Sequence, residues 1–96
     1  MTELVRLDAE REDQFTALYR SDFDRVLALV YALSGSRVAA EEIVQEAFTA
    51  AHREWARIAG YRDPGAWVRA VAMNHARSRV RRRAAEARAL VRLRAR

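Results

Sequence analysis

Apolar residues recur at steps of three and four along most of this chain, and this spacing restricts its fold more than any other feature does. The stripe of the first periodic stretch consists of Phe15, Leu18, Tyr19, Phe23, Val26, Leu27, Val30 and Leu33. Side chains spaced in this way line one face of an α-helix, so the stretch that begins near Glu10 is expected to be helical. The chain has one proline and three glycines and is rich in alanine and arginine, a composition that favours helix over strand.

The residues that flank this stripe indicate where the first helix begins and ends. Residues 1–9 show no clear period, and we expect a frayed N-terminus there. Ser21 and Asp22 have side chains that cap helices, so the pattern allows either one long helix or two helices that meet at this point. Gly35 favours a helix end, and Ser36 is a suitable N-cap for the next helix.

A second periodic stretch runs from about residue 38 to residue 58, and its stripe consists of Val44, Ala47, Phe48, Ala51, Trp55 and Ile58. Four residues that lie off this stripe form what we call the polar flank: Glu41, Glu42, Gln45 and Glu46. The sequence AGYRDPG follows over residues 59–65 and is rich in turn residues, so a loop is expected. Asp63 followed by Pro64 marks the next helix start, since a carboxylate can cap a helix and proline fits its first turn.

The last helix is expected to begin at Pro64. At about 100° per residue, Trp67, Val71, Asn74 and Ser78 fall in one narrow strip that starts apolar and becomes polar. We therefore expect the first two turns to pack on the other helices and the rest to meet solvent or a polar partner. The predicted fold is an all-α, compact bundle of three long helices, or four if the first one divides. Its expected core residues are Phe15, Leu18, Val26, Leu27, Val30, Val44, Phe48, Trp55, Trp67 and Val71.

Charge is divided unequally along the chain. All 18 basic residues are arginine, and residues 1–63 hold eight of them against twelve acidic residues, a balance of −4. Residues 64–96 hold ten arginines and one acid, Glu86, a balance of +9. This division indicates two partners, a nucleic acid for the basic part and a protein for the acidic part. The alternative is an arginine-rich tail that stays solvated.

Composition also excludes several kinds of protein. There is no cysteine, and the two histidines, His52 and His75, are not spaced as metal ligands. No nucleophile and base are paired, and no phosphate-binding loop is present, so we expect neither an enzyme nor a cofactor. No apolar run approaches the roughly 18 residues of a membrane span, and no secretory signal is visible. A cytoplasmic protein without a metal and without a membrane anchor is therefore expected.

Several ordered motifs together resemble a known family. These are FTALYRSDFDRVLALVYALSG, then EEIVQEAFTAAHREW, then a short loop with glycine, then AWVRAVAMNHARSRVRRR. The combination, which covers roughly residues 13–83, closely resembles region 2 of bacterial extracytoplasmic-function (ECF) sigma factors of the sigma-70 family. The resemblance implies a helical domain over residues 10–83, with residues 84–96 as a helical extension or the start of an interdomain linker. A complete ECF factor has a second domain, region 4, so we expect this chain to be a domain fragment or a truncated protein.

The resemblance also implies a function and a set of site residues. Proteins of this kind bind the clamp helices of the largest subunit of core RNA polymerase, recognise the non-template strand of the promoter −10 element, and are commonly silenced by an anti-sigma factor. On this basis the polar flank is expected to contact polymerase. The residues expected to contact DNA are Tyr61, Arg62, Asn74, Arg77, Ser78 and Arg81.

The chemistry of these residues suits such roles, although each has a plainer reading. The polar flank could pair with arginines of a partner helix, or it could be an ordinary solvated face. Tyr61 offers a ring on which a base can stack, or it could belong to a simple connection. The Asn74 amide can donate to and accept from a base edge, or it could bond locally. Arg77 and Arg81 lie four residues apart and could hold phosphates, which give affinity without sequence preference.

Two other functions fit the same features. One is a helical protein-interaction module whose polar flank binds a partner and whose basic tail is incidental. The other is a regulator that reads double-stranded DNA with a helix-turn-helix. The second is disfavoured because the arginines come late in the last helix, whereas a recognition helix usually reads bases with its N-terminal residues.

Overall fold

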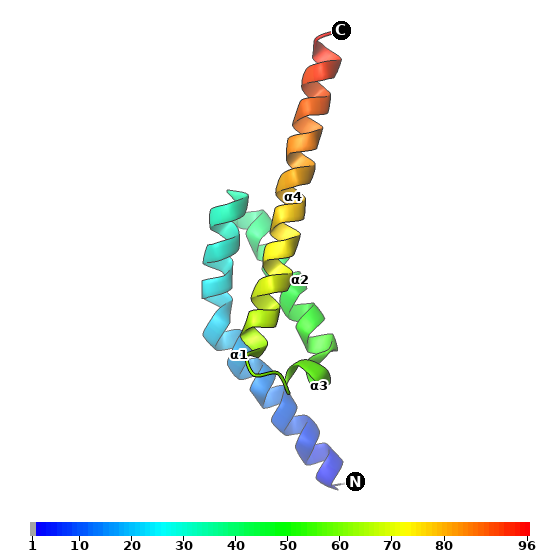
Figure 1. The fold of residues 1–96 in the computed structure, drawn as a ribbon. Coiled ribbons are helices and arrows are strands. Elements are labelled where there is room, and N and C mark those ends of the chain that lie inside the picture. Colours follow the sequence, from blue (N-terminus) through cyan, green and yellow to red (C-terminus); the bar gives the residue numbers. More distant parts are fainter. Residues whose placement is uncertain (1) are drawn as a thin grey trace.

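The structure, a computed structural model that describes residues 2–96, is built from helices alone over that range. The helices are α1 (Thr2–Ser34), α2 (Arg37–Arg53), α3 (Trp55–Ile58) and α4 (Pro64–Arg94). Figure 1 shows α1, α2 and the first half of α4 side by side, with the two termini at opposite ends of an elongated molecule of 69 × 22 × 21 Å. The predicted all-α bundle of three to four helices is confirmed.

The first helix differs from expectation at its start. We expected a frayed N-terminus over residues 1–9, but residues 2–9 are helical and exposed, whereas Met1 lies outside the described residues. Arg6 accounts for part of this difference, because its guanidinium lies 2.5 Å from Glu3 and 4.0 Å from Glu10, one turn away on either side. Pairs at these spacings stabilise a helix without any apolar stripe, which is why periodicity did not reveal it.

α1 is also continuous through the point where the sequence allowed a break. The Ser21 hydroxyl does not cap a new helix; it donates to the Leu18 carbonyl at 3.1 Å and lies 2.8 Å from the Asp22 carboxylate. Serine that bonds back to the preceding turn often bends a helix, and Figure 1 shows α1 changing direction in its middle. The cap signal at Ser21 and Asp22 therefore corresponds to a bend within one helix.

The connection between α1 and α2 is a tight turn that the sequence predicted. Gly35 has a φ of +70°, in the left-handed region that glycine enters without a steric penalty. Ser36 is the N-cap of α2, and its hydroxyl accepts a hydrogen bond from the Ala39 amide at 3.2 Å. The turn places α1 and α2 antiparallel, so that their apolar faces meet.

The core lies where α1, α2, α3 and the first half of α4 meet. Of the ten expected core residues, five are buried, namely Val26, Val30, Val44, Phe48 and Trp55. The other five are partly buried and packed against that core, namely Phe15, Leu18, Leu27, Trp67 and Val71. Phe15 meets Phe48 and Trp55 edge to face, with ring centroids 6.4 and 5.4 Å apart, and the Trp55 indole donates to the Arg11 carbonyl at 2.7 Å. The polar edge of the indole is thereby satisfied inside the bundle.

The buried face of α4 is not the one that the sequence indicated. It consists of Gly65, Val68, Ala72 and Ala76, while Trp67 and Val71 lie at its border. Trp67 and Val71 pack against the core as expected, but they do not form the buried face of the helix. Small side chains on the buried face let α4 approach α1 and α2 closely. A prediction based on large apolar residues misses these small side chains.

Beyond Ala76 no residue of α4 is buried. Residues 84–94 continue the helix past the other elements, as Figure 1 shows, and α4 ends at Arg94. None of the helices that the structure describes is both long and apolar enough to cross a membrane.

Candidate functional site

The polar flank lies on the outer side of α2, where its four side chains are exposed. The polar flank and the apolar stripe lie on different sides of α2. Because Val44 and Phe48 of the stripe are buried, the flank faces solvent. Each flank residue has a partner within the chain. Glu41 pairs with Arg37 at 3.1 Å, and the Gln45 amide donates to the Tyr19 hydroxyl at 3.2 Å.

The other two flank residues reach across to α4. Glu42 lies 3.3 Å from the Arg79 guanidinium, and Glu46 lies 3.7 Å from Nδ1 of His75. The polar flank and the basic part of α4 therefore share an edge and are not separate surfaces, which the sequence did not reveal. These side chains are largely exposed, so each pair contributes little and can be exchanged for contacts with a partner.

An open groove runs beside the polar flank, between α1 and α2. Its α1 side is formed by Tyr19, Phe23, Asp24 and Leu27, and its α2 side by Arg37 and Val38 with the flank. Val38 is 69% exposed and so adds apolar surface to the groove. The groove thus combines apolar contact area with carboxylates along one rim, which suits a partner helix that carries basic residues.

The second region is the loop between α3 and α4, residues 59–63. Tyr61 is 40% exposed, and Arg57 donates to its hydroxyl while the guanidinium carbon lies 5.6 Å from the ring centroid. Arg57 also pairs with Glu54 at 2.8 Å, and this carboxylate raises the pKa of Arg57 above its ordinary value. Sequence reasoning overlooked Arg57, although its place four residues before Tyr61 could have suggested the contact.

The end of this loop is fixed by Asp63. Asp63 is the N-cap of α4 and accepts a hydrogen bond from the Ala66 amide at 3.2 Å, with Pro64 in the first turn, which confirms the helix start that the sequence predicted. Arg62 is exposed, and among residues 2–96 its side chain has no hydrogen bond or ion pair within the chain. Its guanidinium is thus free to meet a phosphate.

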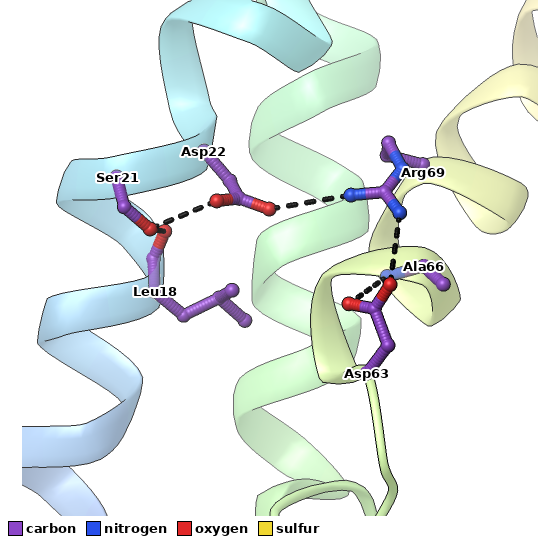
Figure 2. A network of polar contacts seen from close by, with 6 residues as sticks. All are labelled: Leu18, Ser21, Asp22, Asp63, Ala66 and Arg69. Carbon is purple, nitrogen blue, oxygen red and sulfur yellow. Dashed lines mark hydrogen bonds and ion pairs between the residues drawn. The ribbon is translucent and has the colours of Figure 1, made fainter.

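A network of three charged residues holds this loop end against α1, as Figure 2 shows. Arg69 lies between two carboxylates, with Nη1 3.5 Å from Asp22 and Nη2 3.2 Å from Asp63. The Asp22 side chain is only 15% exposed and that of Arg69 30%. Gly65 lies beneath them, because a Cβ there would come within 2.4 Å of the Asp22 carboxylate. Sequence reasoning named none of these contacts.

The third region is the outer face of α4, which we define as Asn74, Arg77, Ser78 and Arg81. All four are exposed, and helical geometry places them on the side away from the buried face of Val68, Ala72 and Ala76. Arg81 donates to the Ser78 hydroxyl at 3.2 Å. At a rise of about 1.5 Å per residue, this face extends from roughly 15 to 25 Å beyond the start of α4.

The structure thus exposes every residue that the sequence assigned to binding, and it places them in three regions. Within the described residues, no cluster of three or more histidines and carboxylates could hold a metal ion. The side chains present are carboxylates, amides, hydroxyls and guanidinium groups on a helical bundle, a set suited to binding a polyanion and a protein.

Comparison with known proteins gave one match. The family model for sigma-70 region 2 matches residues 18–86, well over half of the chain. No curated protein and no solved structure matched. The matched range contains the polar flank, the 59–63 loop and the outer face of α4. Sigma-70 proteins are RNA polymerase sigma factors, which act in transcription initiation. The chain therefore belongs to the sigma-70 region 2 family.

Proposed function

We propose that this chain is the promoter-recognition domain of an ECF sigma factor, which binds the clamp helices of core RNA polymerase and the non-template strand of the promoter −10 element. The observation that carries the proposal is the placement of the outer face of α4. It is exposed and basic and lies on the helix that the 59–63 loop enters, while the polar flank of α2 meets the same helix through Arg79 and His75.

Polymerase would be bound by the polar flank and the groove beside it. The pairs that Glu42 and Glu46 make with α4 are exposed and weak, so basic residues of the clamp can replace Arg79 and His75 at little cost. The apolar groove wall, with Leu27 and Val38, would supply contact area that charge alone does not. The affinity for polymerase would then come both from charge pairing at the flank and from burial of apolar surface in the groove.

DNA would be bound along the loop and α4. Arg77 and Arg81 would hold phosphates, and Asn74 would donate to and accept from a base edge. Tyr61 would stack on a base with Arg57 retained at its hydroxyl edge, an arrangement in which the arginine holds the ring in place. Arg62, which has no partner among residues 2–96, would add a further phosphate contact.

The ECF assignment and its regulation rest on the motif resemblance. The same resemblance implies a location in the bacterial cytoplasm and an anti-sigma factor that would cover the polar flank or the outer face of α4. An anti-sigma factor on the polar flank would compete with polymerase, because both would use the same exposed carboxylates.

Selection from a pool of single-stranded DNA tests the proposal. The 96-residue chain, alone and with core RNA polymerase, is incubated with a randomised pool of about 20 nucleotides, and the retained strands are sequenced. We expect enrichment of one short motif, and Asn74→Ala should relax the preference at one position of that motif. Retention of unselected sequences by both samples, or equal loss of affinity for all sequences on Asn74→Ala, would contradict the proposed reading of bases.

A further inference from the structure

We propose that Arg69, with Asp22, is a positioning residue that holds the 59–63 loop for base selection, although neither side chain would touch DNA. The inference rests on the proposed function and adds to it a determinant of sequence preference that lies behind the loop and does not contact DNA. The residues come from α1 and α4, 47 positions apart in the chain, and they meet at the point where the loop enters α4 (Figure 2).

The loop is attached to the bundle at both ends. At its start, the Tyr61 amide donates to the carbonyl of Ile58 at 2.9 Å, and Ile58 is completely buried. At its end, Asp63 accepts from the Ala66 amide with one oxygen and from Arg69 with the other. Between these attachments the side chains of Tyr61 and Arg62 project outward. The direction of both therefore depends on where Asp63 is held.

Arg69 determines that position because it joins Asp63 to a fixed point on α1. One nitrogen of its planar guanidinium faces Asp63 and another faces Asp22. The rigid fork therefore sets the spacing between the loop end and α1, which a single flexible ammonium could not do. Asp22 is itself fixed by the hydroxyl of Ser21 at 2.8 Å.

Gly65 provides independent support for a close fit. A Cβ at this position would meet three side chains of the network, with Asp22 at 2.4 Å, Arg69 at 3.2 Å and Asp63 at 3.3 Å. Gly65, the one glycine of α4, thus stands where the charged groups converge on this helix. The Arg69–Asp22 pair is partly buried between two helices, whereas Asp63, at 62%, is as exposed as most other ion-paired residues of the described chain.

A test must separate positioning from direct binding by charge. If Arg69 held a phosphate, its removal would weaken binding to all strands, and Arg69→Lys would restore it. If Arg69 positions the loop, Arg69→Lys keeps the charge but cannot reach both carboxylates, and selectivity stays low. Asp22→Asn should lower selectivity as well, even though it removes a negative charge and so favours DNA binding in general.

The measurement uses the full 96-residue chain and two single strands: the strand most enriched from the randomised pool and a scrambled strand of equal composition. The ratio of their dissociation constants is measured for Asp22→Asn, Arg69→Gln, Arg69→Lys and the control Arg25→Gln, which removes an exposed arginine that has no hydrogen bond or ion pair in the described chain. We expect the ratio to fall about tenfold in the first three, the effect of losing one charge-assisted hydrogen bond, and to stay unchanged in the control.

Circular dichroism identifies which variants are folded at the assay temperature. If Arg69→Gln is unfolded, the milder variants Asp22→Asn and Arg69→Lys decide whether Arg69 positions the loop. An unchanged ratio in folded variants would overturn the positioning role while leaving the proposed function intact. Uniform weakening that Arg69→Lys restores would also overturn it, because Arg69 would then be a phosphate contact. If the unaltered chain showed no preference between the two strands, the proposed function itself would fail.

Discussion

Replacement of Gly65 by alanine tests how closely α4 is fitted against α1. Position 65 is buried and helical, and the added Cβ would lie 2.4 Å from a carboxylate oxygen of Asp22. No real Cβ contact is so short, so the Asp22 side chain must move. Asp22 is attached to Arg69 on one side and to Ser21 on the other, and its displacement would break at least one of these contacts.

Two opposing effects determine the size of the change. Alanine is favoured over glycine in a helix by about 0.5–1 kcal/mol, which would stabilise the variant. Loss of a hydrogen bond between charged groups costs about 1.5–3 kcal/mol, and the partial exposure of Arg69 places the cost near the lower end. We therefore expect Gly65→Ala to reduce the free energy of unfolding by about 1 kcal/mol, which corresponds to a fall of about 4–8 °C in Tm.

The assay is urea unfolding followed by circular dichroism, with Gly60→Ala as the matched control. A Cβ at Gly60 would meet only the Arg57 carbonyl at 3.6 Å, an ordinary contact, so this variant should be neutral or slightly more stable. If Gly65→Ala were as stable as Gly60→Ala, the network of Asp22, Asp63 and Arg69 would be too loose to matter, and the reasoning would be refuted.

Three further changes test the core, a turn and the DNA contact. Phe48→Ala should cost about 3–5 kcal/mol in urea unfolding, because Phe48 is buried against three aromatic rings; a loss below roughly 1 kcal/mol would place it outside the core. Gly35→Ala should destabilise by about 1 kcal/mol by the same assay, since its φ of +70° is unfavourable for alanine, and no loss would show that the turn rearranges. Arg77→Ala should weaken all single strands alike and reduce the slope of log affinity against log salt by about one; a change confined to one sequence would contradict phosphate binding.

The parts of the fold that could be predicted from the sequence depend on local chemistry. The α4 start at Asp63 and the turn at Gly35 follow from neighbouring residues that cap or end a helix. The exposure of the polar flank follows from the α2 stripe, since a helix that buries one face must present the other. These features required no knowledge of how the helices are arranged.

The parts that could not be predicted depend on contacts between distant segments. Asp22 and Arg69 are 47 residues apart, and nothing near either residue indicates that they meet. The buried face of α4 was misplaced because Ala72 and Ala76 become core residues only when another helix lies against them. The Glu42–Arg79 contact was missed for the same reason, since it requires α2 and α4 to pack side by side.

Binding to core RNA polymerase tests the central claim most directly. The 96-residue chain is immobilised, core polymerase is passed over it, and the dissociation constant is measured for the unaltered chain, Gln45→Ala, Glu46→Arg and the control Glu86→Arg. Glu86→Arg makes the same charge change on an exposed part of α4 outside the polar flank. We predict a stable complex that Gln45→Ala weakens, that Glu46→Arg weakens at least about tenfold, and that Glu86→Arg leaves intact. No complex, or equal weakening by Glu46→Arg and Glu86→Arg, would contradict the assignment of the polar flank to polymerase.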